Sequence, residues 1–255
     1  MNYDQSKAEF IKTIKRMSGR YSTYEVFNDF VEMATYAISN SVYFSQKRED
    51  KYLEIAKKYK PEEVNRFAEL LGLVTMGLES KFGDFLGECF HGLEIHNKNV
   101  GQFFTPYHVC QLMAKITIGD GCKEQIEERG YIGINEPTCG AGACLIAACE
   151  RYKEIGVNFQ QQVLMIAQDI DFRCACMCYI QLSLLGASII VRVGDTLRME
   201  FREEFYSPLF MLNRWRFVER QNLTAEAVKT TSAIVDTPKE KNAYSADKKG
   251  QFCLF

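Results

Sequence analysis

The stretch Glu136-Pro137-Thr138-Cys139-Gly140-Ala141-Gly142 decides the fold, because it connects an expected strand to an expected helix. A β-type run over Tyr131–Asn135 precedes it, and a helical apolar pattern over Ala143–Ile155 follows it. Glycines in such a loop let the backbone turn sharply and let a ligand lie against bare amides. In doubly wound α/β sheets this is where the ligand binds. From these residues alone, a plain strand–helix turn is an equally good interpretation.

The residues of this loop also indicate which kind of ligand it suits. A dinucleotide fingerprint needs a third glycine three residues further on, but Leu145 stands there, so the loop is not built for a pyrophosphate. Glu136 places an acid before the glycines, and a carboxylate attracts positive charge. The loop therefore favours a cationic ligand.

Strands and helices continue to alternate after the loop. Val163–Ala167 predicts a buried strand, Phe172–Leu185 a helix that Gly186 ends, and Ser188–Val193 another strand rich in β-branched residues. Alternation of this kind implies a mostly parallel sheet with right-handed crossovers. We predict an α/β, Rossmann-like domain over residues 99–220, followed by a polar and flexible tail over residues 221–255.

The first 98 residues predict an all-helical domain. Apolar residues recur at helical spacing in Ala8–Met17 and Tyr24–Phe44, and Pro61 suits the first position of a third helix. Asp84–Ile95 predicts a short fourth helix. Strand-like alternation is missing from this region of the sequence.

Two further acids follow the expected second and third strands. Asp169 stands in Gln168-Asp169-Ile170-Asp171, and Asp195 stands in Gly194-Asp195-Thr196-Leu197. A carboxylate at the end of the second strand can accept hydrogen bonds from both hydroxyls of a ribose, and Ile170 can pack on the attached base. The alternative is that one acid of the pair caps the following helix; we expect Asp171 to cap and Asp169 to bind. Asp195 by itself is also compatible with an ordinary turn.

Upstream lies the segment Gly101-Gln102-Phe103-Phe104-Thr105-Pro106. Thr105 is expected to cap a helix whose first residue is Pro106. The alternative to a functional role is a capped helix that two phenylalanines pack.

GQFFTP, EPTCGAG, AQDID and GDTL, in this order over about Asp84–Leu197, resemble the methylation subunit of type I restriction–modification systems, an adenine-specific (N6) DNA methyltransferase. The resemblance implies S-adenosylmethionine as cofactor. It implies that the first two segments hold the methionine part, the acid of the third holds the ribose, and the acid of the fourth holds the adenine ring. The residues to which these cofactor-binding roles apply are Phe104, Thr105, Pro106, Glu136, Pro137, Cys139, Gly140, Gly142, Asp169, Ile170, Asp195 and Thr196.

The sequence departs from this family at the catalytic motif. The family carries Asn-Pro-Pro-aromatic at the end of its fourth strand, where polar groups accept hydrogen bonds from the target amine and the ring stacks on the flipped base. This chain has no Asn-Pro-Pro, and its nearest match is Ser207-Pro208-Leu209-Phe210, preceded by a poor strand pattern over Phe201–Tyr206. Ser207, Pro208 and Phe210 are the candidate catalytic residues. The alternative is a turn whose apolar residues anchor the edge of the domain.

Three functions therefore remain open. The first is an adenine-specific DNA methyltransferase that works with a partner, such as a specificity subunit, for target recognition. The second is a non-catalytic cofactor-binding subunit of a modification complex, and the third is a methyltransferase that acts on RNA or protein. A net charge of −2 argues against tight DNA binding by this chain alone, although Arg214, Trp215, Arg216 and Arg220 are candidates for nucleic-acid contact. Solvated arginines on an edge helix are the alternative.

Composition limits the remaining possibilities. Hydrophobic residues make up 47% and charged residues 25%, as in soluble globular proteins, and no apolar run approaches the length of a membrane span. The absence of a signal-peptide pattern predicts a cytoplasmic protein whose ten cysteines are reduced. Cys174, Cys176 and Cys178 do not share one helix face and have no second ligand pair, so we expect no metal site. Because no apolar run is long enough to span a membrane, we also expect no membrane contact.

Overall fold

The computed structural model of the chain describes residues 1–94, 105–119, 121–213 and 251–253. Its helices are α1 (Tyr3–Met17), α2 (Thr23–Asn40), α3 (Gln46–Ala56), α4 (Pro61–Ser80), α5 (Phe85–Gly92), α6 (Tyr107–Thr117), α7 (Gly121–Arg129), α8 (Ala143–Glu154), α9 (Phe159–Gln162) and α10 (Phe172–Leu184), and its strands are β1 (Ile132–Glu136), β2 (Val163–Asp169), β3 (Ser188–Asp195), β4 (Glu200–Tyr206) and β5 (Gln251–Cys253). Residues 208–213 are also helical.

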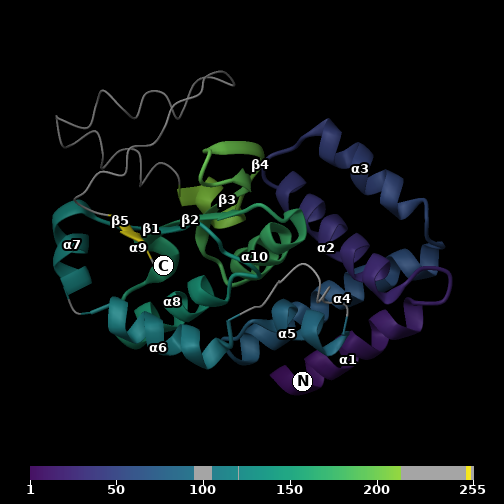
Figure 1. Cartoon of the computed structure of the whole chain (residues 1–255), viewed down its shortest axis with the longest axis horizontal. Coiled ribbons are helices and arrows are strands. Elements are labelled where there is room, and N and C mark those ends of the chain that lie inside the picture. Colours follow the sequence, from purple (N-terminus) through teal and green to yellow (C-terminus); the bar gives the residue numbers. More distant parts are fainter. Residues whose placement is uncertain (95–104, 120, 214–250, 254–255) are drawn as a thin grey trace.

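The strands form one sheet in the order β4-β3-β2-β1-β5 (Figure 1). Strands β1, β2, β3 and β5 run parallel to their neighbours, whereas β4 runs antiparallel to β3. The prediction of an α/β fold with a mostly parallel sheet is confirmed. Within the polar and flexible tail predicted over residues 221–255, residues 251–253 form strand β5 and pair with β1.

The order of the strands locates the ligand-binding edge of the sheet. Helix α8 connects β1 to β2, and α10 connects β2 to β3, so the chain moves in one direction along the sheet and both helices lie on the same side of it (Figure 1). Strand β5 lies on the opposite side of β1. The strand order therefore reverses at β1, and ligands of doubly wound sheets bind beside the carboxyl ends of the strands at this switch point.

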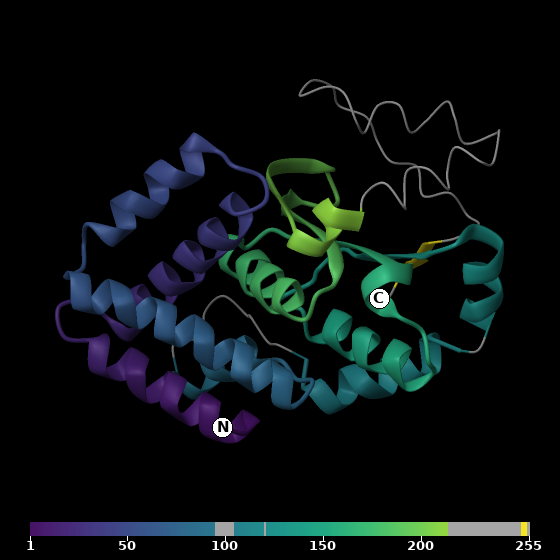
Figure 2. The same ribbon diagram turned by 180° about the vertical axis from the view of Figure 1, so that it is seen from behind.

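Helices α1, α2, α4 and α5 form a further layer against α10. Figure 2 shows this layer from behind, with α2 beside α10. Its buried core contains aromatic residues such as Phe10, Phe27 and Phe30, together with Met177 and Ile180 of α10. The helical layer thus shares its core with a helix of the α/β part. The predicted domain boundary at residue 98 lies outside the described residues and stays a prediction.

The ends of these helices follow their capping residues. Ser22 and Glu25 form a capping box at α2, and Pro61 is the first residue of α4, as expected. Helix α2 ends at Asn40 rather than at Phe44. None of the helices in the described part of the chain combines the length and apolar character that crossing a membrane requires.

Candidate functional site

The three predicted carboxylates stand at the carboxyl ends of three neighbouring strands. Glu136 ends β1, Asp169 ends β2 and Asp195 ends β3. Glu136 is in register with Ala167, and Asp169 is in register with Val193. Each acid therefore lies two residues beyond the previous one along the sheet. Because neighbouring strands are about 4.8 Å apart, the three acids form a staggered row along one edge.

Hydrogen bonds from neighbouring strand ends hold the loop that follows β1, here called the glycine loop (residues 137–142). The Cys139 amide donates to the Gln168 carbonyl at 2.8 Å. The Gly140 amide donates to Asp169 Oδ2 at 2.8 Å, and the Thr196 hydroxyl donates to the Pro137 carbonyl at 2.8 Å. Both the second and the third strand end thus contact the loop. The loop is preorganised, which lowers the entropy lost when a ligand binds to it.

Gly142 allows this loop to pass directly into α8. Its φ of 100° lies in the left-handed region, which residues with a Cβ avoid. A Cβ at this position would also lie 3.1 Å from the Cys178 sulfur and 3.2 Å from the Cys178 Cα, so it would press against α10. Gly142 therefore serves the close packing of α8 on α10 as well as the turn.

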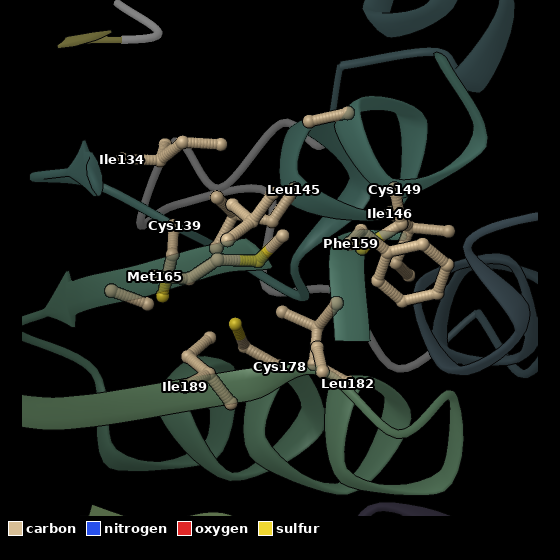
Figure 3. Close-up of a cluster of buried hydrophobic side chains, with 14 of the residues drawn as sticks. Ile134, Cys139, Leu145, Ile146, Cys149, Phe159, Met165, Cys178, Leu182 and Ile189 are labelled. Carbon is tan, nitrogen blue, oxygen red and sulfur yellow. The ribbon is translucent and has the colours of Figure 1, made fainter. Parts of the chain in front are cut away.

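The Cys139 side chain anchors the glycine loop to the buried core. Its side chain is buried and lies beside Cys178 and Met165 in the core (Figure 3). A hydrogen bond with Cys178, together with burial, raises the pKa of the Cys139 thiol. Since the thiol points into the core, a contact of Cys139 with a ligand would have to come from its backbone.

Glu136 is a buried acid with an unused acceptor. Only 2% of the residue is exposed. Its Oε1 accepts hydrogen bonds from the amide of Thr138 at 3.1 Å and from the Thr138 hydroxyl at 3.4 Å, whereas its Oε2 is buried and lacks a partner among the described residues. Burial raises the pKa of this carboxyl, and the nearby Asp169 raises it further. A buried acceptor without a partner is costly, so this atom indicates a place for a hydrogen-bond donor.

Asp169 organises the site through both of its oxygens. Oδ2 accepts from the Gly140 amide, and Oδ1 accepts from the Asp171 amide at 2.8 Å. Burial still raises the pKa of Asp169 above its ordinary value. Asp171 caps α10 by accepting from the Arg173 amide at 2.8 Å. The expected division of labour is thus confirmed for the cap, and ligand binding by Asp169 stays a prediction.

Asp195 and Ile170 complete the edge. Asp195 Oδ1 accepts from the amides of Leu197 at 2.9 Å and Arg198 at 3.1 Å, which closes the turn that follows β3. Its side chain remains one-third exposed. Ile170 is 66% exposed directly beside Asp169. This surface is suited to a flat apolar ring.

The segment before α6 differs from the expectation. Pro106, not Thr105, is the N-cap of α6, and the Thr105 side chain does not cap it, so the predicted Thr105 cap is wrong. The Pro106 carbonyl accepts from the amides of Val109 and Cys110 instead. Phe104 lies outside the described residues. Thr105 and Pro106 remain candidates for contact with the cofactor.

The structure places the predicted catalytic segment at the opposite end of the sheet. Because β4 runs antiparallel to β3, it begins opposite Asp195 and ends opposite Ile190. Ser207 is fully buried, donates to the Ala187 carbonyl at 2.7 Å and accepts from the Ile189 amide at 3.0 Å. Six residues of extended strand, about 20 Å, separate this position from Asp195.

The structure therefore does not bring Ser207, Pro208 and Phe210 to the row of acids, and their catalytic role is not supported by this geometry. Ser207 accepts from the Phe210 amide at 3.2 Å, so it caps the helical residues 208–213, which include Pro208. The Phe210 ring stacks on Tyr206 at 5.6 Å between ring centroids. These residues anchor the edge of the domain, which is the alternative that the sequence had left open. Arg214, Trp215, Arg216 and Arg220 lie outside the described residues.

Gln168 and Asn135 form a polar pair beneath the glycine loop that the sequence pattern did not predict. Gln168 is buried, its amide group donates to Asn135 Oδ1 at 3.4 Å, and its Oε1 lacks a partner among the described residues. A polar residue near the end of an otherwise apolar strand was the available signal. Within the described part of the chain, no group of three metal-binding side chains is found.

The site as a whole fits a ligand that carries positive charge and hydroxyl groups. Neither Glu136 nor Asp169 has an ion-pair partner among the described residues, and the pKa of each carboxyl is raised. A cation at this edge would favour the ionised acids, and donors on the ligand would use the free Glu136 oxygen. The amino and sulfonium groups and the ribose of S-adenosylmethionine have this chemistry.

Comparison with known proteins gives the family. No curated protein matches. Among solved structures, the chain is similar to a putative class I S-adenosylmethionine-dependent methyltransferase from Listeria monocytogenes, with 12% identity and a TM-score of 0.43 over 84% of this chain and 70% of the other. It is also similar to the methyltransferase subunit of a type I restriction–modification system from Streptococcus thermophilus, with 14% identity and a TM-score of 0.38 over 76% of this chain and 58% of the other. The family described as N-6 DNA methylase matches residues 83–241, more than half of the chain. The chain therefore belongs to the N-6 DNA methylase family.

Proposed function

We propose that this protein transfers a methyl group from S-adenosylmethionine to the exocyclic amine of adenine in DNA. Family membership makes it a methyltransferase with S-adenosylmethionine as cofactor. The observation that carries the proposal is the buried Glu136 carboxylate with its free Oε2, at the switch point of the sheet. The DNA substrate is inferred from the family.

We assign the parts of the cofactor to the row of acids. Glu136 Oε2 accepts a hydrogen bond from the amino group of the methionine part, and the amides of the glycine loop face the same part. Asp169 accepts from the ribose hydroxyls, Ile170 packs on the adenine ring, and Asp195 accepts from the exocyclic amine of that ring. The bound cofactor supplies an activated methyl group on a positively charged sulfur.

The protein's contribution to the reaction is positioning. Hydrogen bonds with Gln168, Asp169 and Thr196 fix the conformation of the glycine loop from within the protein, so the loop needs little reorganisation on binding. Holding the reacting groups in line supplies a large part of the rate acceleration of such transfers. Burial of Glu136 keeps water from its carboxylate. The target amine has to lie at this same edge, about 20 Å from Ser207.

Methyl transfer to DNA tests the proposed activity and the proposed position of the catalytic centre together. The unaltered protein, with its partner subunits present, should incorporate tritiated methyl groups into unmethylated DNA. Phe210→Ala should retain this transfer per folded molecule, because the Phe210 ring packs on Tyr206 far from the row of acids. Phe44→Ala, at an exposed aromatic residue, is the matched control.

Three outcomes would contradict these expectations. Loss of transfer in Phe210→Ala alone, with normal folding and cofactor binding, would return residues 207–210 to the catalytic centre. Absence of transfer to DNA under every condition, despite cofactor binding, would favour a non-catalytic subunit. Transfer to RNA or to a protein in place of DNA would favour the third function.

We also expect DNA binding by this chain alone to be weak. Its net charge is −2, and neutralisation of phosphate dominates the affinity of proteins for DNA. Fluorescence anisotropy near physiological salt should give a dissociation constant of about 1 µM or weaker, as for non-specific contacts. A specificity subunit would then supply target recognition. Nanomolar, sequence-selective binding by the isolated chain would show that no such partner is needed.

A further inference from the structure

Gln181 is a polar side chain in the centre of the protein. It lies on α10 and is fully buried, between Ile180 and Leu182, which are also fully buried. Its Oε1 accepts from the Leu86 amide at 3.0 Å. Its Nε2 donates to Asp84 Oδ1 at 2.9 Å and to the Ala141 carbonyl at 2.8 Å. Both donors of the carboxamide and its acceptor are therefore in use.

The partners of Gln181 come from two different parts of the fold. Asp84 and Leu86 belong to the start of α5, where Asp84 caps the helix by accepting from the Gly87 amide at 3.0 Å. Ala141 belongs to the glycine loop, between two glycines with positive φ. One side chain thus joins the helical layer to the loop that we assign to the cofactor.

The Ala141 carbonyl is a sensitive point of that loop. Gly140 and Gly142 have φ angles of 54° and 100°, so the residues on both sides of Ala141 can rotate more freely than others. The hydrogen bond from Gln181 sets the direction of the Ala141 carbonyl. The next peptide N–H, that of Gly142, then donates to the Cys139 carbonyl at 2.8 Å. A loop without these two bonds would hold its amides in several orientations.

The buried Asp84 also needs an explanation. It is 4% exposed, and burial raises its pKa to about 6 in spite of the hydrogen bonds from Gln181 and Gly87. An apolar pair could fill the same space without removing a charge from water. The acid caps α5 and also orients the Gln181 carboxamide, because an acceptor at Asp84 leaves the second N–H directed at Ala141.

We propose that Gln181, oriented by Asp84, is a positioning residue that sets the conformation of the glycine loop for the cofactor. The proposal rests on the assigned role of that loop. It makes cofactor affinity depend on how α5 packs against α10, at a distance from the ligand itself. A structural role alone would require only the hydrogen bonds between α10 and α5.

Gln181→Met tests the role, because methionine has a similar volume and no hydrogen-bonding amide. Isothermal titration with S-adenosylhomocysteine should show affinity at least about tenfold weaker than that of the unaltered protein, as for loss of a buried hydrogen bond. The control is Tyr59→Phe, which removes a buried hydrogen bond of 2.7 Å to Asp29 in the helical layer. Its thermal stability should fall, and its affinity should not change.

A swapped pair separates positioning from stability. In the double variant Asp84→Asn with Gln181→Glu, the new amide donates to the new carboxylate, which also still accepts from the Leu86 amide. The variant gives up the cap on the Gly87 amide, because the same oxygen, Asp84 Oδ1, accepts from both Gly87 and Gln181. The link between α10 and α5 is restored, but the Ala141 carbonyl has lost its donor. We expect thermal stability above that of Gln181→Met, with affinity for S-adenosylhomocysteine as low as in that variant.

Affinity equal to that of the unaltered protein, in either Gln181→Met or the swapped pair, would overturn the positioning role. The swapped pair also serves if Gln181→Met does not fold. Absence of binding by the unaltered protein at millimolar S-adenosylhomocysteine would instead overturn the cofactor site, and this role with it. The two failures are therefore distinguishable.

Discussion

Replacing Glu136 by glutamine is expected to weaken S-adenosylmethionine binding on the order of 10²-fold while the unliganded protein becomes more stable. The loss follows because a buried charge that faces a cationic ligand contributes several kcal/mol to binding, about 2–5 kcal/mol when one partner is removed. The gain follows because burial raises the pKa of the Glu136 carboxyl, so ionisation of this group opposes folding. Opposite changes in affinity and stability are typical of a group retained for binding.

The sign of the pH dependence is fixed by the raised pKa. In the folded state Glu136 holds its proton to a higher pH than the ordinary value of 4.5. Between the ordinary pKa and the raised pKa of this carboxyl, the folded state therefore binds more protons than the unfolded state. The stability of the folded state falls as the pH rises through this range. The stability gain of Glu136→Gln should be present at pH 8 and should shrink toward pH 5.

Thermal denaturation at both pH values and titration with S-adenosylmethionine provide the measurement. Glu204→Gln is the matched control, because Glu204 forms a partly buried ion pair with Arg192 at 2.6 Å and lies on β4 away from the glycine loop. It should not gain stability or lose affinity. Unchanged affinity in Glu136→Gln would remove Glu136 from the site.

The helices and strands that carry the core follow from the sequence. Predicted and observed bounds differ by two residues or fewer for the first three parallel strands, because their apolar β-branched runs are buried on one face by α8 and α10. Helices α3 and α7 could not be found in this way. Each buries a single residue along its length, Ile55 in α3 and Cys122 in α7, so neither carries an apolar period.

The row of acids was predictable for a related reason. A residue that follows a parallel strand is placed at the carboxyl edge of the sheet by chain connectivity alone, so Glu136, Asp169 and Asp195 had to lie at one edge. The free Oε2 of Glu136 and the contacts of Gln181 depend on packing between distant segments. A single glutamine within a helical apolar pattern has no signature in the sequence.

The direction of β4 was readable but was not used. Four residues connect β3 to β4, whereas a parallel connection needs a crossover of about a dozen residues or more. An antiparallel hairpin was therefore the only connection available. It carries the end of β4, and Ser207 with it, away from the row of acids. Similarity to a motif predicted residues 207–210 at the catalytic centre, whereas chain geometry places them at the end of the sheet opposite the row of acids.

Asp169→Ala is expected to weaken S-adenosylhomocysteine binding by about 10²-fold or more. The variant loses the acceptor for the ribose hydroxyls, and it also frees the amides of Gly140 and Asp171, which now donate to the two carboxylate oxygens at 2.8 Å. Each unpaired buried group costs about 1–3 kcal/mol. Asparagine is a poor substitute here, because its NH2 group would face one of these two N–H donors.

Adenosine separates the two roles of Asp169, since it has the ribose but lacks the amino acid part that the glycine loop is expected to hold. If Asp169 binds the ribose, Asp169→Ala should weaken adenosine binding as well as S-adenosylhomocysteine binding in isothermal titration. The control is Asp171→Ala, which removes the cap of α10 and should lower stability by about 0.5–2 kcal/mol without changing either affinity. Normal adenosine affinity in Asp169→Ala, together with weakened S-adenosylhomocysteine binding, would show that Asp169 acts only by holding the loop. The ribose would then have to be bound by another group at this edge of the sheet.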